Sequence, residues 1–396
     1  MKNHFDIRTS SIDAKAINET IQRALSSAGL DTTSGPMHSV IETIKRALAS
    51  AGLSDAVRSA PASESVVDAV ARVGEPTDDI ESVSWPASEK PNATGTFQTF
   101  EFSNQFGTRS YKLYVPSQIT NTPPAMMVML HGCTQSADDF ARGTQMNRLA
   151  ESHGFLVVYP EQAGHANSSK CWNWFKAQDQ MRDAGEPALI AGIVHDVAAR
   201  HGVDGRRIFV AGLSSGAAMA VIMGETYPEL FAGVGAHSGL PYGSAHDIPS
   251  AMAAMKGGRG RPSSLNGLLG TQPALRKGLV QAIPTIVFHG DRDHTVRQTN
   301  GSEIVRQANG AYLARSGDVA LLTRTQCDTA SGGRSYTREI HADGSGQAHI
   351  ECWTLHGAGH AWSGGNASGS YTDGTGPDAS AEIVRFFLSL PRAGSA

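Results

Sequence analysis

The sequence predicts an α/β protein with a mostly parallel, doubly wound sheet and a helical N-terminal extension. From about residue 94 onward, short apolar runs alternate with segments of helical periodicity, which is the pattern of βα units. One apolar run, 208–213, leads through a G-x-S-x-G pentapeptide into a helix of small residues. Before residue 94 the composition changes and a helical repeat replaces the strands. We therefore expect a repeat-bearing extension and linker at 1–93 and an α/β domain at 94–396.

The bulk composition limits the classes of function. The 396 residues are 40% hydrophobic and include 43 glycines, which suits a loop-rich globular enzyme. The net charge of −4 and the lack of a long basic run predict no nucleic-acid partner. No apolar run reaches the length of a membrane span and no Cys or His spacing is typical of a metal site, so we expect no membrane span, metal or cofactor. Residues 1–10 are polar and lack the apolar core of a secretory signal, which predicts a cytoplasmic protein.

The N-terminal extension contains an internal repeat, because residues 19–30 recur with few changes as 42–53. Apolar residues of the first copy fall on one helical face, and Gly29 and Gly52 stand where each helix would end. Two such short helices cannot bury their apolar stripes alone. They either pack on the chain's own α/β domain or, through residues 1–60, dock on a hydrophobic partner or polymer surface.

The α/β domain is expected to begin with an antiparallel hairpin at 97–102 and 111–115. Further apolar runs predict buried strands at 125–130, 155–159, 208–213, 233–237, 285–289 and 350–355. Helices are predicted in a segment ending near 153, at 188–200, directly after Ser214 and after the capping residue Asp378. Residues 240–282 separate two strands and are predicted to form a lid or a simple surface crossover.

The G-x-S-x-G pentapeptide centres on Ser214 and has the strand before it and the helix after it that a nucleophile elbow requires. Gly212 and Gly216 allow the sharp turn that would lift the Ser214 hydroxyl clear of the sheet. The N-terminus of the following helix would stabilise negative charge at the same point. Ser214 is therefore the predicted nucleophile of a serine hydrolase, and the alternative is a βα loop with a capping serine.

A nucleophilic serine needs a base that is oriented by a carboxylate, and in a fold of this kind the chain order is Ser, then Asp or Glu, then His. The strand at 285–289 is followed by Asp291 and Asp293. We choose Asp293 and keep Asp291 as the alternative, since Asp291 is expected to pair with an arginine or cap a turn. After the last strand, a glycine-rich loop carries His360, the predicted base, whereas His356 is expected to hydrogen-bond locally.

Catalysis by a serine also needs N–H donors for the tetrahedral oxyanion. One is the amide of Ser215, directly after the nucleophile, and the other is expected in the loop after the strand at 125–130. Gly132 in that loop permits close backbone approach, and the amide of Cys133 is the best candidate.

The four cysteines, Cys133, Cys171, Cys327 and Cys352, leave the redox state open. Cys133 and Cys171 each follow a predicted strand and could meet near one edge of the sheet. Cys327 and Cys352 flank two predicted strands joined by a glycine-rich turn and could face each other. Four reduced thiols are the alternative, because the compartment decides between them.

Together these segments resemble the polyhydroxybutyrate depolymerase family of esterases, which includes feruloyl and acetylxylan esterase relatives. The matching pieces run through most of residues 95–390: HGCTQ at 131–135, VVYPEQ at 157–162, CWNWF at 171–175, GLSSG at 212–216, YPELF at 227–231, HSG at 237–239 and GHAW at 359–362. The resemblance implies an α/β-hydrolase fold, a triad of Ser214, Asp293 and His360, and an oxyanion hole formed by the Cys133 and Ser215 amides. Many relatives are secreted, which makes an extracellular location the alternative to the cytoplasm.

Aromatic residues near the predicted catalytic mouth are candidates for substrate contact. Trp174 is expected to flank the substrate, and Trp172 either does the same or pins its loop. Trp362 and His131 are also expected to bind substrate.

The sequence thus predicts a serine carboxylic ester hydrolase that works through an acyl-enzyme. Short-chain hydroxyalkanoate esters or oligomers are the expected substrates, with feruloyl or acetyl sugar esters as the alternative. A serine peptidase of the same fold is a second enzyme hypothesis, although no peptide pocket is specified. The hypothesis of another class is an inactive protein bound to polymer granules through its N-terminal repeat, against which the intact Ser, Asp and His set argues.

Overall fold

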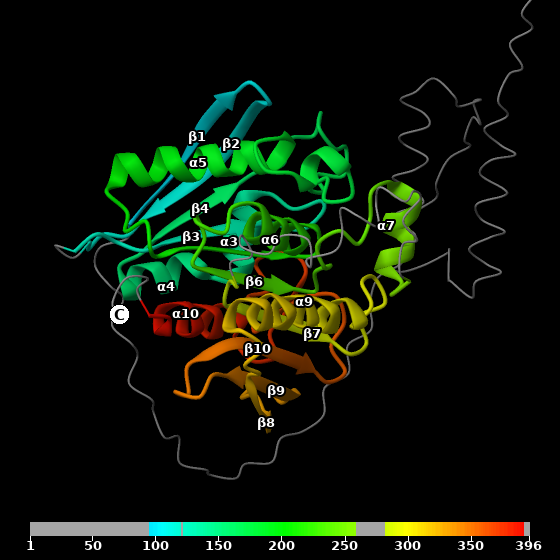
Figure 1. Cartoon of the computed structure of the whole chain (residues 1–396). Helices are drawn as coiled ribbons and strands as arrows, with labels where there is room; N and C mark the ends of the chain where they lie inside the picture. The colour runs from blue at the N-terminus through cyan, green and yellow to red at the C-terminus, as the bar shows by residue number, and fades with distance from the viewer. Residues whose placement is uncertain (1–94, 120–121, 259–281, 392–396) are drawn as a thin grey trace, which may run out of the picture. The chain divides into compact units, whose positions relative to one another are not determined.

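The computed structural model describes residues 95–119, 122–258 and 282–391 (Figure 1). The chain divides into two units, Met1–Pro86 and Ala87–Ala396, and every described residue belongs to the second. The predicted repeat, the docking role of residues 1–60 and most of the predicted lid lie outside the described residues. Of the lid, the structure describes 240–258 and residue 282.

The domain is built on a ten-stranded sheet with the order β1-β2-β4-β3-β5-β6-β7-β10-β9-β8. Its six central strands are parallel, as the alternation of strands and helices predicted. They are β4 (Leu156–Pro160), β3 (Met126–Leu130), β5 (Ile208–Leu213), β6 (Gly233–His237), β7 (Thr285–Gly290) and β10 (Ala348–Leu355). Five of these strands, β3 to β7, are buried along their whole length, which explains why they appear in the sequence as uninterrupted apolar runs.

Antiparallel strands flank this centre on both sides. The predicted hairpin forms β1 (Thr96–Asn104) and β2 (Gly107–Val115), and β2 pairs with β4. At the other edge, β9 (Ser335–Ala342) pairs with β10, and β8 (Leu322–Thr329) closes the sheet with every residue exposed.

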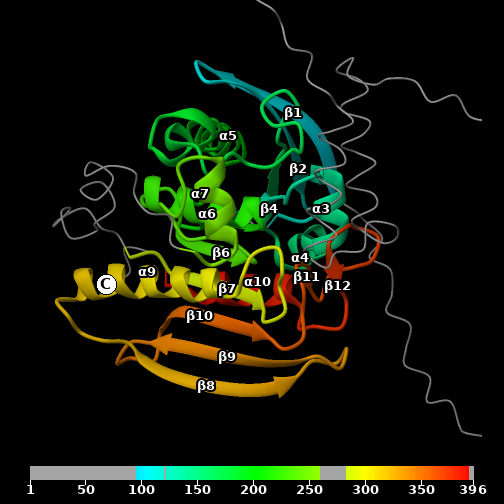
Figure 2. The ribbon, with the colours of Figure 1, turned by 90° about the vertical axis from the view of Figure 1, so that its right-hand side faces the viewer.

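Helices cover both faces of the sheet (Figure 2). Residues of α5 (Gly185–His201), α6 (Ser215–Thr226) and α9 (Thr299–Ser316) join one buried apolar cluster. Residues of α3 (Ala137–Thr144), α4 (Met146–His153) and α10 (Ala379–Ser389) join a second. Strand β3 shows the division, because Met126, Val128 and Leu130 enter the first cluster. Met127 and Met129, which point the other way, enter the second.

The helix expected to end near residue 153 is instead two helices, α3 (Ala137–Thr144) and α4 (Met146–His153). Gln145 between them has a left-handed φ of 55°, and its amide closes α3 by donating to Ala141 O. The other prediction about a helix end is confirmed, since the Asp378 side chain accepts a 2.9 Å hydrogen bond from the Ala381 amide at the start of α10.

Four short elements complete the fold: the 3-10 helix η1 (Ala177–Gln180), α7 (Ile248–Met255), and the two-stranded pair β11 (Trp362–Ser363) and β12 (Thr372–Asp373). Across the described part of the chain, every helix is too short or too polar to span a membrane.

Candidate active site

Ser214 lies at the tip of a sharp turn between β5 and α6, with φ 57° and ψ −119°. This left-handed backbone is unusual for a residue with a side chain and is typical of strained functional turns. The turn is possible because of Gly216, where an added Cβ would lie 2.0 Å from the carbonyl oxygen of Leu130. Gly212 is equally constrained, since its Cβ would lie 2.5 Å from the Gly216 backbone. The elbow predicted from the pentapeptide is therefore present.

His360 and Asp293 meet, although 67 residues separate them: His360 Nδ1 is 2.6 Å from Asp293 Oδ2. The Asp293 side chain is completely buried, and the His360 side chain is 13% exposed. Asp293 Oδ1 accepts the amides of Thr295 and Val296 at 2.9 and 2.8 Å, which fixes the carboxylate in its loop. The ring of His360 is thus held by a rigid acceptor on one side.

The ionisation of Asp293 follows from its partners. Burial alone would raise its pKa, but hydrogen bonds from His289 and His360 and the nearby imidazole charge outweigh burial and hold the pKa well below the ordinary value. Asp293 is therefore a carboxylate at neutral pH, and His360 Nδ1–H is the donor of the bond between them.

Asp291 has a different role. Its Oδ2 lies 3.1 Å from His356 Nδ1, and its Oδ1 accepts the Gly357 amide at 2.7 Å. Asp291 thus caps the turn that leads to His360, which is one of the two roles expected for it. The other expected role was pairing with an arginine, and its side-chain partner is instead a histidine. The Arg292 amide adds a 3.0 Å bond to Ala358 O, so the two loops are tied at several points.

His237, at the end of β6, connects the elbow to the loop that carries His360. Its carbonyl oxygen accepts the Ser214 amide at 2.9 Å, and its ring Nε2 accepts the Ser363 amide at 3.0 Å. The ring stacks against Phe288 and Trp362 and is fully buried. Burial, together with the charges of the neighbouring imidazoles, lowers the pKa of His237 to about 3, so this ring is neutral at ordinary pH.

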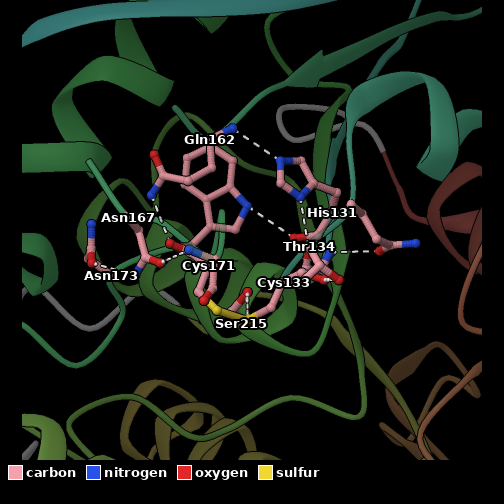
Figure 3. The surroundings of a disulfide bond; sticks show 12 residues. His131, Cys133, Thr134, Gln162, Asn167, Cys171, Asn173 and Ser215 are labelled. Carbon is pink, nitrogen blue, oxygen red and sulfur yellow. Dashed lines mark hydrogen bonds between the residues drawn. A yellow bond between two sulfur atoms is a disulfide. The ribbon is translucent and has the colours of Figure 1, made fainter. Parts of the chain in front are cut away.

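A disulfide joins Cys133 to Cys171 beside the elbow (Figure 3). The Ser215 hydroxyl lies 3.4 Å from Cys133 Sγ and must be the donor, because a disulfide sulfur carries no hydrogen. The two residues whose amides are the expected oxyanion donors therefore lie side by side. The loop of Cys133 is tied further, since the Gly132 amide donates to Gln135 Oε1 at 2.9 Å and the Thr134 amide to Ser169 O at 2.7 Å.

The proposed pairing of Cys327 with Cys352 is not formed, and both cysteines are free. Cys327 lies on β8 and Cys352 on β10, with β9 between them. Strands two apart in a sheet are separated by roughly 9–10 Å, which a disulfide cannot bridge. In the ranges that the structure describes, no group of three or more His, Cys, Asp or Glu side chains is arranged to hold a metal ion.

Three side chains expected to bind substrate are buried instead. His131 and Trp362 are each 1% exposed and Trp174 is 6% exposed. Both ring nitrogens of His131 are occupied, because Nε2 accepts the Gln162 amide and Nδ1 donates to Gly132 O. Trp362 Nε1 donates to Ser380 Oγ. These side chains support the loops and have almost no surface to offer a substrate, contrary to the sequence prediction.

Trp172 also has a structural role, the second of the two roles considered for it. It is fully buried, and its Nε1 donates to His131 O at 3.1 Å. Trp172 therefore pins the loop of Cys171 to the loop of Cys133.

Sequence reasoning missed the segment 364–371, which lies between β11 and β12 and contacts the loop after β3. Ser370 donates its amide to Asp139 Oδ1 at 3.0 Å, and its carbonyl accepts from Gln135 Nε2 at 3.1 Å. Tyr371 reaches Thr134 with its hydroxyl. One of the residues that hold this segment, Gln135, belongs to the HGCTQ motif, and its place in that motif was the one signal in the sequence for the contact.

Comparison with known proteins identifies the family. The family model described as "Esterase PHB depolymerase" matches residues 109–324. Poly(3-hydroxyalkanoate) depolymerase C of Paucimonas lemoignei is 32% identical over 68% of this chain and 63% of its own length. The probable acetylxylan esterase A of Aspergillus fumigatus is 37% identical over 36% of this chain and 37% of its own length. The chain spans less than two thirds of each of these curated relatives.

The fold comparison agrees. The acetyl xylan esterase from Aspergillus awamori has a TM-score of 0.55 and 20% identity, and the match covers 74% of this chain and 99% of that one. This likeness shows the α/β-hydrolase fold. Because the family match spans more than half of the 396 residues, the chain belongs to the esterase PHB depolymerase family.

Proposed function

We propose that this protein is a serine carboxylic ester hydrolase whose catalytic triad is Ser214, His360 and Asp293. The observation that carries the proposal is the 2.6 Å contact between His360 Nδ1 and the buried Asp293 carboxylate. It occurs in a chain that also places Ser214 in an elbow conformation at the end of a parallel strand. The carboxylate keeps the imidazole proton on Nδ1, so Nε2 is the nitrogen that takes the serine proton.

In the proposed reaction Ser214 Oγ attacks the ester carbonyl carbon while His360 Nε2 accepts its proton. The amides of Cys133 and Ser215 donate to the oxyanion, and each such donor contributes about 3 kcal/mol of transition-state stabilisation. The protonated imidazole then gives its proton to the departing alcohol, which leaves the acyl group on Ser214. Water attacks the acyl-enzyme by the same path, releasing the carboxylic acid and restoring the serine hydroxyl.

Short-chain hydroxyalkanoate esters or oligomers are the proposed substrates. Support comes from the family match and from the similarity to the Paucimonas lemoignei depolymerase. Docking on polymer granules through residues 1–60 stays a prediction, because those residues lie outside the described ranges.

A second candidate is hydrolysis of acetyl or feruloyl esters on sugars. It is favoured by the likeness to acetylxylan esterases, and by feruloyl esterase B of Neurospora crassa, which is 36% identical over 35% of this chain and 47% of its own length. The same catalytic residues would serve both candidates, since the chemistry at the carbonyl is identical.

The proposed location is extracellular. The Cys133–Cys171 disulfide supports this alternative over the cytoplasm, because structural disulfides persist mainly in oxidising compartments. Fractionation of the producing cells would test it, and recovery only from the cytoplasm would contradict it.

A substrate panel with a nucleophile variant tests the function. The purified chain is assayed on hydroxybutyrate dimers and trimers, p-nitrophenyl acetate and butyrate, methyl ferulate and acetylated xylan. We expect Ser214→Ala to lower kcat on every cleaved ester by about 10³-fold or more and to abolish labelling by a fluorophosphonate probe. Ser152→Ala, on the exposed surface of α4, is the matched control and should leave both unchanged. Full activity of Ser214→Ala would overturn the assignment.

A further inference from the structure

Tyr371 is an exposed aromatic residue with an unusual backbone. The residue is 47% exposed to solvent, and its backbone φ is 53°. A bulky residue in the left-handed region costs energy, and such strain gathers at functional sites. The core gains little from a ring placed this way, since about half of it stays in water.

The hydroxyl of this ring is anchored beside the expected oxyanion hole. Tyr371 Oη lies 3.2 Å from Thr134 Oγ1, and Thr134 Oγ1 in turn lies 2.6 Å from the Cys133 carbonyl oxygen. Because the single hydroxyl proton of Thr134 goes to that carbonyl, the tyrosine is the donor in the first bond. Thr134 also has a left-handed φ, of 66°. The polar end of Tyr371 is thereby used, and the ring faces remain as apolar surface.

The backbone of Tyr371 is anchored to the other side of the site. Its carbonyl oxygen accepts the Trp362 amide at 2.7 Å, and Trp362 follows His360 by two residues. Tyr371 therefore connects the loop of the catalytic histidine to the loop of Cys133. Its neighbour Ser370 holds the same segment to Asp139 on α3.

We propose that the Tyr371 ring is a substrate-binding surface, on which an apolar or aromatic part of the ester packs next to the scissile carbonyl. This rests on the proposed ester hydrolysis and adds a specificity-determining residue to it. A ring fixed at both ends loses little conformational freedom when a ligand covers it, which favours binding. Esters with a larger apolar group gain from the contact, and ethyl acetate does not.

The test compares ethyl acetate with two esters that each carry a larger aromatic group on one side of the carbonyl: ethyl cinnamate on the acyl side and benzyl acetate on the alcohol side. We expect Tyr371→Ala to lower kcat/KM on at least one of the larger esters by about tenfold, mostly through KM, and to change ethyl acetate by less than about threefold. Tyr371→Phe keeps the ring and should retain most activity, and Tyr371→Leu should lie between. Phe106→Ala, which removes an exposed aromatic in the β1–β2 turn, is the control.

Two results would overturn this inference while the proposed function stands. One is an equal loss on all three esters in Tyr371→Ala. The other is a fall in kcat on all three in Tyr371→Phe, which would make the hydroxyl a positioning group for the loop of Cys133. A wild-type chain that cleaves no ester and is not labelled at Ser214 would overturn both. Melting temperatures of each variant separate loss of contact from loss of fold.

Discussion

Two aspartates that are two positions apart have different partners, and this difference predicts which one supports catalysis. Asp293 binds His360 and is buried, whereas Asp291 binds His356 and the Gly357 amide near the surface. Asp293→Asn would remove the negative charge and let His360 adopt the wrong tautomer. We expect kcat to fall by about 10³- to 10⁴-fold. Asp291→Asn serves as the control and should change kcat by less than about threefold; the reverse order would show that the carboxylate was assigned wrongly.

His237 predicts a dependence of stability on pH. Its pKa is about 3 in the folded chain and takes its ordinary value of 6.5 when the chain unfolds. Below pH 6.5 the unfolded chain binds a proton that the folded chain does not, so stability falls as the pH drops from 6.5 toward 3. The slope from this residue approaches 1.4 kcal/mol per pH unit.

Urea unfolding of His237→Gln, whose amide oxygen can still accept the Ser363 amide, measures this contribution. Between pH 6.5 and 4.5 the variant should lose about 2–3 kcal/mol less of its unfolding free energy than the wild type does. The neighbouring charged and ionisable side chains, Asp293, His289 and His360, are present in both proteins. If the unfolding free energies of wild type and His237→Gln fall by the same amount over this pH range, His237 does not contribute to the pH dependence in this way.

Single residues could be predicted where chain order and strand ends constrain them. Ser214, Asp293 and His360 follow three parallel strands whose carboxyl ends lie along one edge of the sheet, and the structure places His360 against Asp293. His131 and Trp362, which adjoin catalytic candidates in the chain, are expected from the sequence to bind substrate. Adjacency does not fix which way a side chain points, and both turn into the core. Tyr371 belongs to none of the sequence motifs, and its contact with Thr134 joins positions more than 200 residues apart, which local patterns do not reveal.

At the scale of elements, the Cys133–Cys171 disulfide fastens the loop after β3 to the loop after β4 (Figure 3). We expect Cys171→Ser to lower kcat on small esters by about tenfold or more, because a freed loop places the Cys133 amide less accurately. It should also lower the unfolding free energy by about 2–4 kcal/mol. Cys327→Ser, at an exposed free thiol on β8, is the control. Unchanged kcat in Cys171→Ser would show that the loop needs no covalent support.

The elements that could be predicted are those whose burial leaves a pattern. Strands β3 to β7 are wholly buried and appear as apolar runs. Strand β8 is exposed throughout and leaves no apolar run. Two strands are expected near Cys327 and Cys352, but the sequence pattern does not reveal that the two cysteines lie on strands separated by β9. The break between α3 and α4 depends on the conformation of one residue, Gln145, which helical periodicity does not reveal.

At the scale of the whole molecule, the catalytic candidates and the described core all come from one unit, Ala87–Ala396. Both buried clusters are assembled from residues between Tyr111 and Phe387, and they cover the two faces of the central strands. We therefore expect residues 87–396 alone to fold and to hydrolyse soluble esters with kcat/KM within about threefold of the full chain, since a domain with its own complete core can fold alone.

The same fragment separates catalysis from attachment. If residues 1–60 dock on polymer, the fragment should lose sedimentation with polyester granules while it keeps its activity on p-nitrophenyl butyrate. The physical reason is that the two amphipathic helices predicted from the repeat would supply apolar area for adsorption and none of the groups that act on the carbonyl. Equal sedimentation of fragment and full chain would remove the docking role from the N-terminal repeat. An insoluble or inactive fragment would show that the α/β domain needs its N-terminal unit.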